Sequence, residues 1–246
     1  MAETHLRRIV PSVDEAPEVV HLDDRDRLLE LYAPPSSSWL RLNLVASVSG
    51  SAAGSDGTSE TLTSRADRRI LGVIRELADV VLVGANSVRA EGYQLPRRAP
   101  LAIVTRSGDL GGHRLGGSER QAVVFGPESA RAVAAASIDA RFVAVADDSV
   151  ETLLAALRVE GYSSIVCEGG PNLAAQLIAA GVVDELCLTT SPRLNGNALP
   201  LLGPGAAAET PVTLSQLLID DADDTLFARW RVNSSSGPSE ASQATP

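Results

Sequence analysis

The turn Glu168-Gly169-Gly170 joins an apolar run to a helical pattern in the stretch SSIVCEGGPNLAAQLIAAG at 163–181. Two consecutive glycines let the backbone come close to a ligand. The first turn of the following helix presents free N–H groups and the positive end of the helix dipole, which together bind phosphate or pyrophosphate. A tight turn that needs only a positive φ gives the same pattern, so both interpretations stay open. The stretch is not the GxGxxG fingerprint of a standard dinucleotide-binding domain.

Glu168 lies at the carboxyl end of the expected strand, where open α/β sheets bind their ligands. A carboxylate at that place can orient an amine or hydroxyl group of a substrate. It can equally accept backbone hydrogen bonds within the turn.

Hydroxyl groups and arginines gather in two segments upstream. In GTSETLTS at 57–64, Thr63 or Ser64 can cap the next helix, whereas Ser59 is freer to contact a ligand. Arg75 comes late in that helix, where a cation also suits the dipole. In ANSVRAEGYQLPRR at 85–98, which we expect to be a loop, Arg97 and Arg98 are either a phosphate clamp or a solvated pair.

A third segment, IVTRSG at 103–108, places Thr105, Arg106 and Ser107 at another strand end. Such a set suits the 2′-phosphate of NADP, although the motif is weak when taken alone. All these segments follow strands and all suit phosphate or hydroxyl ligands. Their agreement predicts a nucleotide-like pocket.

The composition excludes several other classes of protein. All 21 basic residues are arginine, so the chain has neither a Schiff-base lysine nor the lysine of a phosphate-binding loop. The two cysteines and three histidines lack metal-ligand spacing, and we expect no metal. The net charge of −10 argues against nucleic-acid and anionic-membrane partners. With no apolar run of 18 residues and no signal-peptide pattern, we expect a cytoplasmic protein.

The elements that must position these residues alternate between β-branched apolar runs and helical patterns. We expect strands at 39–48, 79–85, 100–105, 121–125, 141–145, 163–167 and 184–190, helices at 64–78, 127–136, 149–160 and 171–180, and a C-terminal strand pair at 212–219 and 225–232. The alternation predicts a three-layer αβα fold whose mixed, mostly parallel sheet ends in antiparallel C-terminal strands. We expect an N-terminal arm at 1–38, one domain at 39–232 and a disordered tail at 233–246.

Several segments taken in order resemble a known family. They are RLNLVASVSG, GTSETLT, IRELADVVLVGANSVRAEGYQLPRR, PLAIVTRSG and EGGPNLAAQLIAAGVVDELCLTTSP, within about 39–203. This order is similar to the C-terminal-type pyrimidine reductases of riboflavin biosynthesis. Members reduce 5-amino-6-(5-phosphoribosylamino)uracil with NADPH and have the dihydrofolate-reductase-like fold. The resemblance implies that fold, a small-molecule substrate, NADPH as cofactor and a homodimer.

The resemblance also implies roles for individual residues. Glu168 matches the glutamate that contacts and orients the substrate. The other positions that match substrate contacts are Ser59, Arg75, Leu95 and Arg98, with the two arginines on the substrate phosphate. The positions that match cofactor contacts are Val45, Ser87, Glu91, Arg106, Ser107, Gly169, Gly170, Pro171, Asn172, Leu173 and Ala174.

This chain departs from the family pattern near the expected reaction centre. Asn43 replaces a common lysine, Ser49 replaces an aspartate, and EGY at 91–93 replaces a D-[DN]-P triplet. No residue stands out as a general acid, so we expect solvent to supply the proton. We therefore expect an NADPH-dependent reductase of a phosphoribosylaminopyrimidine. The alternatives are a dihydrofolate-type or other pteridine reductase and a non-catalytic nucleotide-binding homologue.

Overall fold

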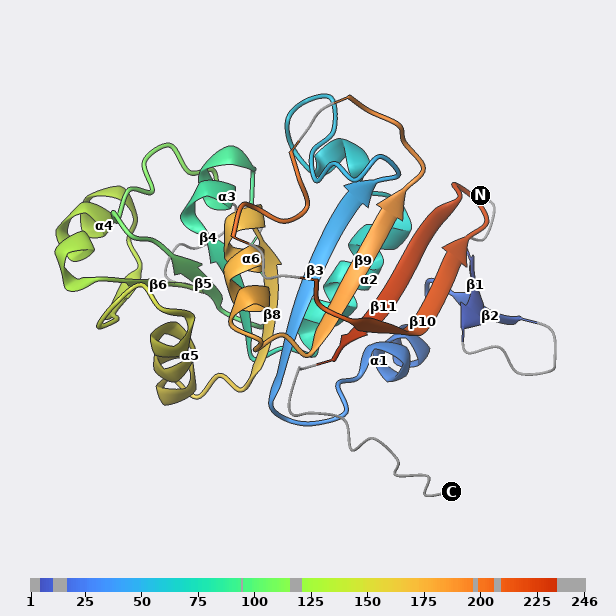
Figure 1. The fold of residues 1–246 in the computed structure, drawn as a ribbon, viewed down its shortest axis with the longest axis horizontal. Helices are drawn as coiled ribbons and strands as arrows, with labels where there is room; N and C mark the ends of the chain where they lie inside the picture. Colours follow the sequence, from blue (N-terminus) through green and yellow to red (C-terminus); the bar gives the residue numbers. More distant parts are fainter. Residues whose placement is uncertain are drawn as a thin grey trace, which may run out of the picture.

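The computed structural model describes residues 5–10, 17–93, 95–115, 121–196, 199–205 and 209–233. One mixed sheet runs through them in the order β2-β1-β10-β11-β9-β3-β8-β4-β5-β6-β7 (Figure 1). Its strands are β1 (His5–Val10), β2 (Glu18–His21), β3 (Trp39–Ser47), β4 (Val80–Gly84), β5 (Leu101–Val104), β6 (Ala122–Gly126), β7 (Arg141–Ala144), β8 (Ser164–Gly169), β9 (Glu185–Ser191), β10 (Val212–Asp220) and β11 (Thr225–Val232).

Strand directions follow the expected fold class. Neighbouring strands are parallel in the part of the sheet that runs β9-β3-β8-β4-β5-β6-β7. The pairs β9–β11, β11–β10, β10–β1 and β1–β2 are antiparallel. The buried strands β4, β5 and β6 are almost continuously apolar, as the two covered faces of a parallel sheet require.

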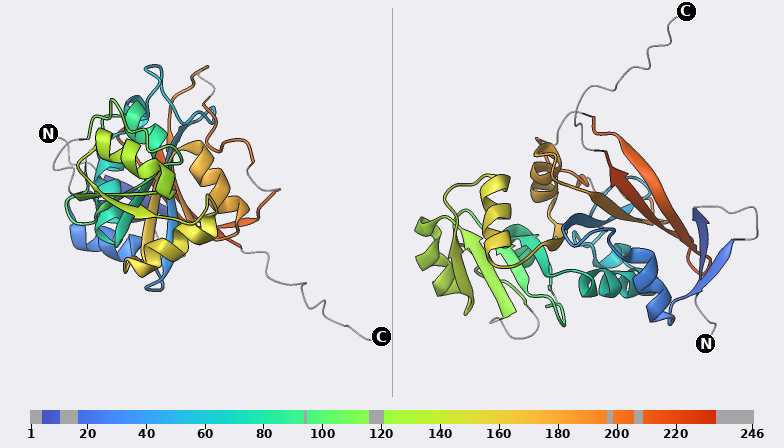
Figure 2. Two further views of the ribbon diagram at one scale, coloured as in Figure 1. Left: turned by 90° about the vertical axis from the view of Figure 1, so that its left-hand side faces the viewer. Right: turned by 90° about the horizontal axis from the view of Figure 1, so that it is seen from below.

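Helices cover the two faces of the sheet unequally. The helices are α1 (Arg25–Tyr32), α2 (Arg65–Glu76), α3 (Ala85–Ala90), α4 (Arg131–Ser137), α5 (Val150–Val159) and α6 (Pro171–Ala179), with 3₁₀ turns at Glu60–Leu62 and Glu128–Ala130. Figure 2 shows α1 and α2 on one side of the sheet and α5 and α6 on the other. The second pair lies over the β8–β4 half of the sheet. No helix of the described residues therefore lies over the same face of β9, β11 and β10 (Figure 1).

Helix α2 begins where its sequence predicts. The Ser64 hydroxyl accepts a hydrogen bond of 3.1 Å from the Asp67 amide, which makes Ser64 the N-cap. Ile70, Val73 and Ile74 are buried against the sheet. The opposite edge of the helix, with Arg75 near its end, remains available to a ligand.

The described residues before Trp39 belong to the same sheet and core as the rest. Strand β1 pairs with β10, and Leu6 in β1 and Leu28 in α1 are completely buried. From the sequence we expected residues 1–38 to form an arm, with no strand or helix predicted in it. Of the disordered tail expected at 233–246, Asn233 is described and its amide donates to the Pro211 carbonyl at 3.1 Å; the rest lies outside the described residues.

Two local differences from the sequence analysis concern the site. The segment 85–98, expected as a loop, opens with the short helix α3, which starts directly after β4. The expected strand at 163–167 continues through Glu168 to Gly169. Both cysteines are buried and neither is in a disulfide, as expected for small core side chains. No helix of the described residues combines the length and apolar character that crossing a membrane requires.

Candidate active site

A cavity of about 950 Å³ opens at the carboxyl ends of β3, β4, β5 and β8. Its volume is at the upper end of the range typical of small-molecule sites. Thirteen of the residues selected from the sequence line it: Val45, Ser59, Arg75, Ser87, Glu91, Arg106, Ser107, Glu168, Gly169, Gly170, Pro171, Asn172 and Leu173. The structure therefore brings together the segments around residues 59, 75, 87, 106 and 168.

A shift in strand register places Glu168 at this cavity. Leu82 of β4 pairs with Cys167, but the next residue of β4, Val83, pairs with Gly169, so Glu168 has no partner across the β4–β8 ladder. Bulges of this kind turn a side chain away from the regular alternation and are frequent beside active sites. Glu168 is thereby turned toward α2.

The Glu168 carboxylate meets Arg75 in a two-point ion pair. Arg75 Nε donates to Oε1 and Nη2 donates to Oε2, each at 2.6 Å. The two side chains are only 17% and 7% exposed. Burial by itself would lower the pKa of Arg75, but the hydrogen bonds that it donates to Glu168 outweigh burial and raise the pKa, so the guanidinium stays charged.

Tyr93 completes this cluster. In the sequence it is notable only as part of EGY at 91–93, which departs from the family pattern. Its hydroxyl donates to Glu168 Oε2, and Arg75 lies 5.3 Å from its ring centroid. Burial, followed by the charge of Glu168, raises the pKa of Tyr93 well above its ordinary value. The phenol is therefore a hydrogen-bond donor at neutral pH. We call Arg75, Tyr93 and Glu168 the Glu168 cluster.

A second pair lies on the wall beside α3. The Ser59 hydroxyl donates to Glu91 Oε2 at 3.1 Å. The resemblance assigns Ser59 to the substrate and Glu91 to the cofactor, and both roles stay predictions. Burial raises the pKa of Glu91, and the hydrogen bond from Ser59 opposes that shift.

The glycine turn fits a diphosphate group. Gly169 and Gly170 have φ of +115° and +86°, in the region that favours glycine. A Cβ at Gly170 would approach Ser87 Oγ to 3.0 Å, so a side chain there would crowd the cavity wall. Pro171 opens α6, and the amides of Asn172 and Leu173 lie in its first turn, which has no intrahelical acceptor for them. The chemistry of this turn suits the dinucleotide NADPH.

Arg106 and Ser107 line another end of the same cavity. Arg106 Nε lies 3.2 Å from Asp148 Oδ2, and both side chains are more than half exposed. An exposed pair of this kind is weak and exchanges readily for a phosphate. The placement agrees with an adenosine-phosphate end for the ligand.

Asp67 lines the cavity although the sequence gave no reason to select it. The residue is 7% exposed, and Thr189 Oγ1 donates to Asp67 Oδ1 at 2.7 Å. Burial raises the pKa of Asp67 to about 6. A carboxyl group with that pKa exchanges protons near neutral pH, which is what a general acid needs. Asp67 is therefore a candidate that the sequence did not single out, and the expectation that solvent supplies the proton stays a prediction.

Three of the selected residues do not line the cavity. Ala174 is fully buried in the core, and its amide already donates to the Gly170 carbonyl at 3.1 Å. Leu95 packs against the main hydrophobic cluster. Arg98 is 73% exposed and pairs with Glu76. A grip of Arg98 on the substrate phosphate stays a prediction.

The two substitutions near the expected reaction centre differ in placement. Asn43 lines the cavity on β3. Ser49 is exposed, and its hydroxyl bonds to the Asn195 carbonyl at 2.9 Å and to Asn195 Oδ1 at 3.0 Å. Within the described residues, no group of three or more His, Cys, Asp or Glu side chains could hold a metal ion.

Comparison with known proteins places the chain in a family. The model of the RibD C-terminal domain matches residues 38–223. The chain belongs to the RibD C-terminal domain family. Two relatives named riboflavin biosynthesis protein RibD match it: that of Mycobacterium tuberculosis is 28% identical over 66% of this chain, and that of Corynebacterium ammoniagenes is 26% identical over 77%. The chain covers 43% and 55% of their lengths, about half of each.

Solved structures agree on the fold. A pyrimidine reductase-like protein of Corynebacterium diphtheriae has a TM-score of 0.68 at 20% identity, with 85% of this chain and 98% of that chain covered. The riboflavin biosynthesis reductase Rib7 of Saccharomyces cerevisiae has a TM-score of 0.60 at 17% identity, with 86% and 100% covered. These neighbours of the RibD C-terminal domain confirm the mixed-sheet, dihydrofolate-reductase-like fold expected from the sequence.

Proposed function

We propose that the protein is an NADPH-dependent reductase that transfers hydride to a phosphoribosylaminopyrimidine. The observation that carries the proposal is the Glu168 cluster on the wall of a cavity whose other wall is the glycine turn before α6. Membership of the RibD C-terminal domain family supports the same reaction class.

When bound, NADPH supplies the hydride. The turn at Gly169–Gly170 and the first turn of α6 would hold its diphosphate, and Arg106 with Ser107 would hold its adenosine end. Val45 lines the cavity where the family resemblance places the nicotinamide, and Ser87 and Glu91 line it at positions that match other cofactor contacts. These residues would bind and orient the cofactor.

The protein's own contribution to the substrate is orientation and charge. Glu168 accepts hydrogen bonds from Arg75 and Tyr93, which fixes its carboxylate in one position at the cavity wall. A carboxylate held in this way binds an amine or hydroxyl group of the substrate with little loss of entropy. Arg75 would meet the substrate phosphate, and Ser59 the neighbouring hydroxyls.

Asp67 is our candidate for the group that supplies a proton. Its carboxyl is held by Thr189 at the cavity wall and carries a proton over part of the neutral range. Reduction of a C=N or carbonyl group needs one proton for each hydride. We expect the rate of the parent to fall as pH rises above 6. Loss of this inflection from the pH profile of Asp67→Asn would support the assignment.

The test of function is NADPH oxidation against phosphoribosylaminopyrimidine, its dephosphorylated analogue, dihydrofolate and a pteridine. We expect turnover of the phosphorylated pyrimidine. In Arg75→Ala we expect KM for this substrate to rise about 10–100-fold, because a charge-assisted contact is lost. Turnover of dihydrofolate instead would support the pteridine-reductase alternative. NADPH binding without turnover of any substrate would support a non-catalytic homologue.

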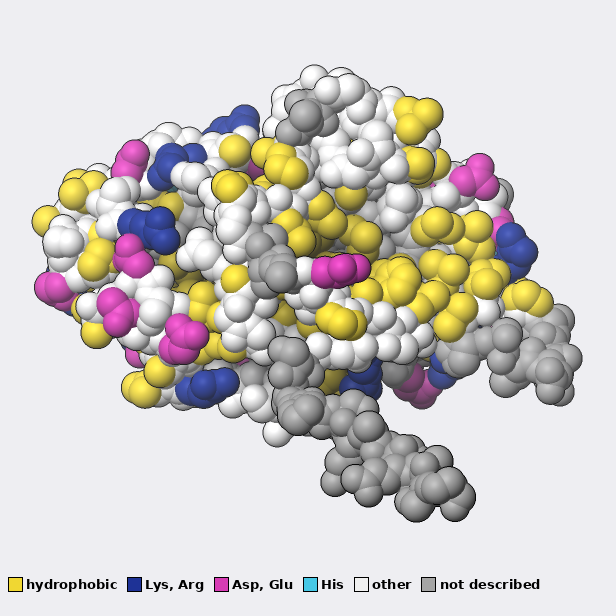
Figure 3. All heavy atoms as spheres, viewed as in Figure 1, with side chains coloured by type: hydrophobic (Ala, Val, Ile, Leu, Met, Phe, Trp, Pro, Cys, Tyr) yellow, Lys and Arg dark blue, Asp and Glu magenta, His cyan; other side chains and the backbone are white. Residues whose placement is uncertain are grey.

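We also propose a homodimer formed through the sheet face that no helix covers. Half-buried apolar side chains gather there on β9, β11 and β10, as the yellow patch in Figure 3 shows: Leu186, Leu188, Leu214, Leu217, Ile219, Leu226 and Trp230. A contiguous apolar surface of this kind is a typical association site. Light scattering should give twice the monomer mass for the parent, and Leu188→Arg should give a monomer.

A further inference from the structure

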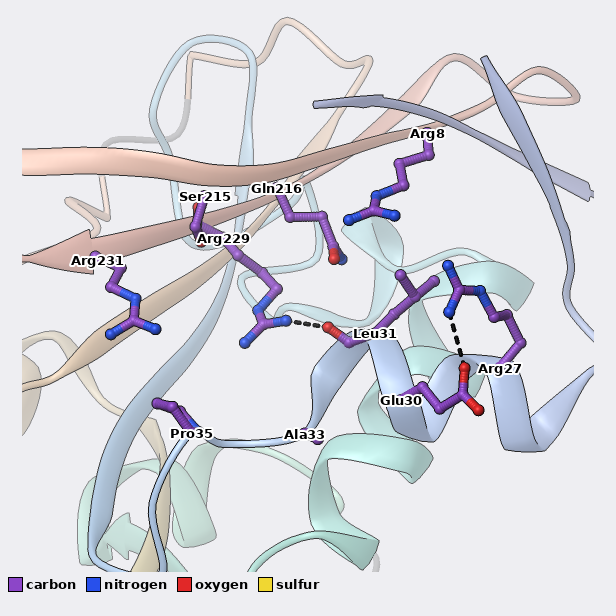
Figure 4. A pocket seen from close by; sticks show the side chains of 10 residues that line it. All are labelled: Arg8, Arg27, Glu30, Leu31, Ala33, Pro35, Ser215, Gln216, Arg229 and Arg231. Carbon is purple, nitrogen blue, oxygen red and sulfur yellow. Dashed lines mark hydrogen bonds and ion pairs between the residues drawn. The ribbon is translucent and has the colours of Figure 1, made fainter. Parts of the chain in front are cut away.

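A second hollow, of about 310 Å³, lies between the end of α1 and the sheet strands β10 and β11 (Figure 4). We call it the arginine pocket. Its polar lining consists of Arg8, Arg27, Glu30, Ser215, Gln216, Arg229 and Arg231. It lies beside the amino end of β9, whereas the large cavity lies at the carboxyl ends of the parallel strands, and no residue lines both.

Gln216 is the unusual residue in this pocket. It is only 3% exposed, and its Nε2 is buried without a hydrogen-bond partner. Leaving a buried donor unsatisfied destabilises a protein by about 1–3 kcal/mol. In Figure 4 the Gln216 amide points into the space between the sheet and α1. A ligand that accepts hydrogen bonds would satisfy it.

The neighbouring arginines also present unused donors. Arg8 Nε is buried without a partner, although Arg8 Nη1 pairs with Glu18 at 3.0 Å. Arg231 is exposed and stacks 5.2 Å from the Trp39 ring, and no ion pair of Arg231 occurs among the described residues. Both guanidinium groups can only donate.

The other charged groups of the pocket are already engaged. Arg27 pairs with Glu30 at 2.8 Å, as Figure 4 shows, and with Glu18 at 2.7 Å. Arg229 pairs with Glu185 at 2.6 Å and donates to the Leu31 carbonyl. Arg8 shares Glu18 with Arg27, Arg41 shares Glu185 with Arg229, and the charge of Asp184 acts on Arg231. Five arginines therefore face four acids, Glu18, Glu30, Asp184 and Glu185, so that one positive charge remains in excess.

We propose that the arginine pocket binds an oxyanion, namely the phosphate group of a small metabolite or free phosphate. The unused groups are all donors and two of them are charged, which matches the acceptor-only oxygens of a phosphate. The volume exceeds that of a single phosphate group, and Leu31 and Pro35 line the remainder. The pocket would thus accept an organic phosphate monoester, with its carbon part on these apolar groups.

The first experiment is a thermal-unfolding titration of the full chain with inorganic phosphate, at constant ionic strength and with saturating NADPH to occupy the large cavity. Ribose 5-phosphate and ribose serve as further probes. We expect a saturable rise in Tm with phosphate and ribose 5-phosphate and none with ribose. A stronger response to ribose 5-phosphate identifies a phosphate ester, and an equal response identifies the free anion. The absence of any saturable response overturns the proposal.

Variants locate the site. Gln216→Leu and Arg231→Gln each remove one contact and should weaken phosphate binding about tenfold or more. Arg7→Gln is the matched control, because Arg7 precedes Arg8 in β1 but pairs with Asp221 outside the pocket. It removes the same charge and should retain the response. Unchanged binding in Gln216→Leu and Arg231→Gln places the anion elsewhere and refutes the pocket.

The expected result for Gln216→Glu is a gain in stability, so a variant that misfolds cannot imitate it. Its carboxylate would place an oxyanion beside Arg8, much as the ligand does. We expect a higher Tm than the parent without phosphate, and no further rise when phosphate is added. A lower Tm together with a retained phosphate response contradicts the proposal.

Discussion

Two buried glutamates occupy clusters of similar composition at opposite ends of the parallel strands. Glu168 is the last residue but one of β8, at the large cavity, and Glu185 begins β9 at the other end of the parallel strands. Each pairs with an arginine that lies 5.3 Å from a tyrosine ring centroid; the stacked pairs are Arg75 over Tyr93 and Arg229 over Tyr32. The same residue types therefore occur in two places with different surroundings.

The Glu185 carboxylate lines neither hollow, although its partner Arg229 lines the arginine pocket. Glu185 is 1% exposed and meets Arg229 and also Arg41, which lies 2.5 Å away. Both arginines donate in addition to backbone carbonyls at the end of α1. Burial alone would raise the pKa of Glu185, but the two guanidinium charges outweigh it and lower that pKa. This cluster joins β3, β9, β11 and α1.

The Glu168 cluster differs because it borders the cavity. One arginine and one tyrosine hold its carboxylate, and the large cavity lies in front of them. A ligand can therefore exchange contacts with the cluster without opening the core. The comparison teaches that the composition of an ion pair does not decide its role, whereas access to a cavity does.

The largest effect is expected from breaking the cluster around Glu185. Glu185→Gln leaves two buried arginines without a counter-charge, and breaking a buried pair costs about 3–5 kcal/mol. Glu168→Gln should cost about 1 kcal/mol, because water in the cavity can hydrate Arg75. Urea unfolding measures both. Equal losses would contradict the distinction between the two clusters.

Activity should show the reverse order. Glu168→Gln removes the charge that orients the substrate, and we expect kcat/KM to fall about 100-fold, as for a misplaced reactant. Steady-state NADPH oxidation with the phosphorylated pyrimidine measures it, and NADPH affinity is the control. A variant with parental kcat/KM would mean that Glu168 has only a structural role.

Asp67 extends the comparison to a carboxyl group buried without an ion pair among the described residues. Its pKa of about 6 in the folded protein is above the ordinary 3.8, so its stabilising contribution is present below pH 3.8 and is lost as pH rises through 6. At pH 8 we therefore expect Asp67→Asn to be about 2 kcal/mol more stable than the parent. Each unit of the pKa shift corresponds to about 1.4 kcal/mol, and the loss of the favourable interaction between the carboxylate and the helix dipole reduces the total. Urea unfolding at pH 4 should show no gain.

Tyr93→Phe should sharpen the description of the Glu168 cluster. It removes one donor to Glu168 and keeps the ring under Arg75. Because Arg75 still holds the carboxylate, we expect KM for the pyrimidine to rise only about 3–10-fold, with about 1 kcal/mol of stability lost. A larger loss than in Glu168→Gln would assign Tyr93 a role of its own in the reaction.

The smallest effect is expected at Arg98. Its pair with Glu76 is on the surface and outside the cavity, and exposed pairs contribute little. If Arg98 reaches the substrate phosphate only transiently, Arg98→Ala should raise KM less than about threefold, a fraction of the Arg75→Ala effect. A rise equal to that of Arg75→Ala would show that both arginines grip the phosphate.

The sequence by itself determined the elements between Trp39 and Val232. Apolar β-branched runs and the 3.6-residue period of the helices are local properties, and they placed most strands and helices within two residues of their observed bounds. The glycine turn before α6 was visible for the same reason. Its signal consists of neighbouring residues in one short stretch.

Only the tertiary structure decided the contacts within the site. The register shift that turns Glu168 toward α2 depends on pairing with β4, and the partners Arg75 and Tyr93 lie 93 and 75 residues away. Asp67 resembles an ordinary first-turn acid of a helix until Thr189 and the sheet bury it. Ion pairs and pKa values depend on distance and burial, which are properties of the packed chain and not of local sequence.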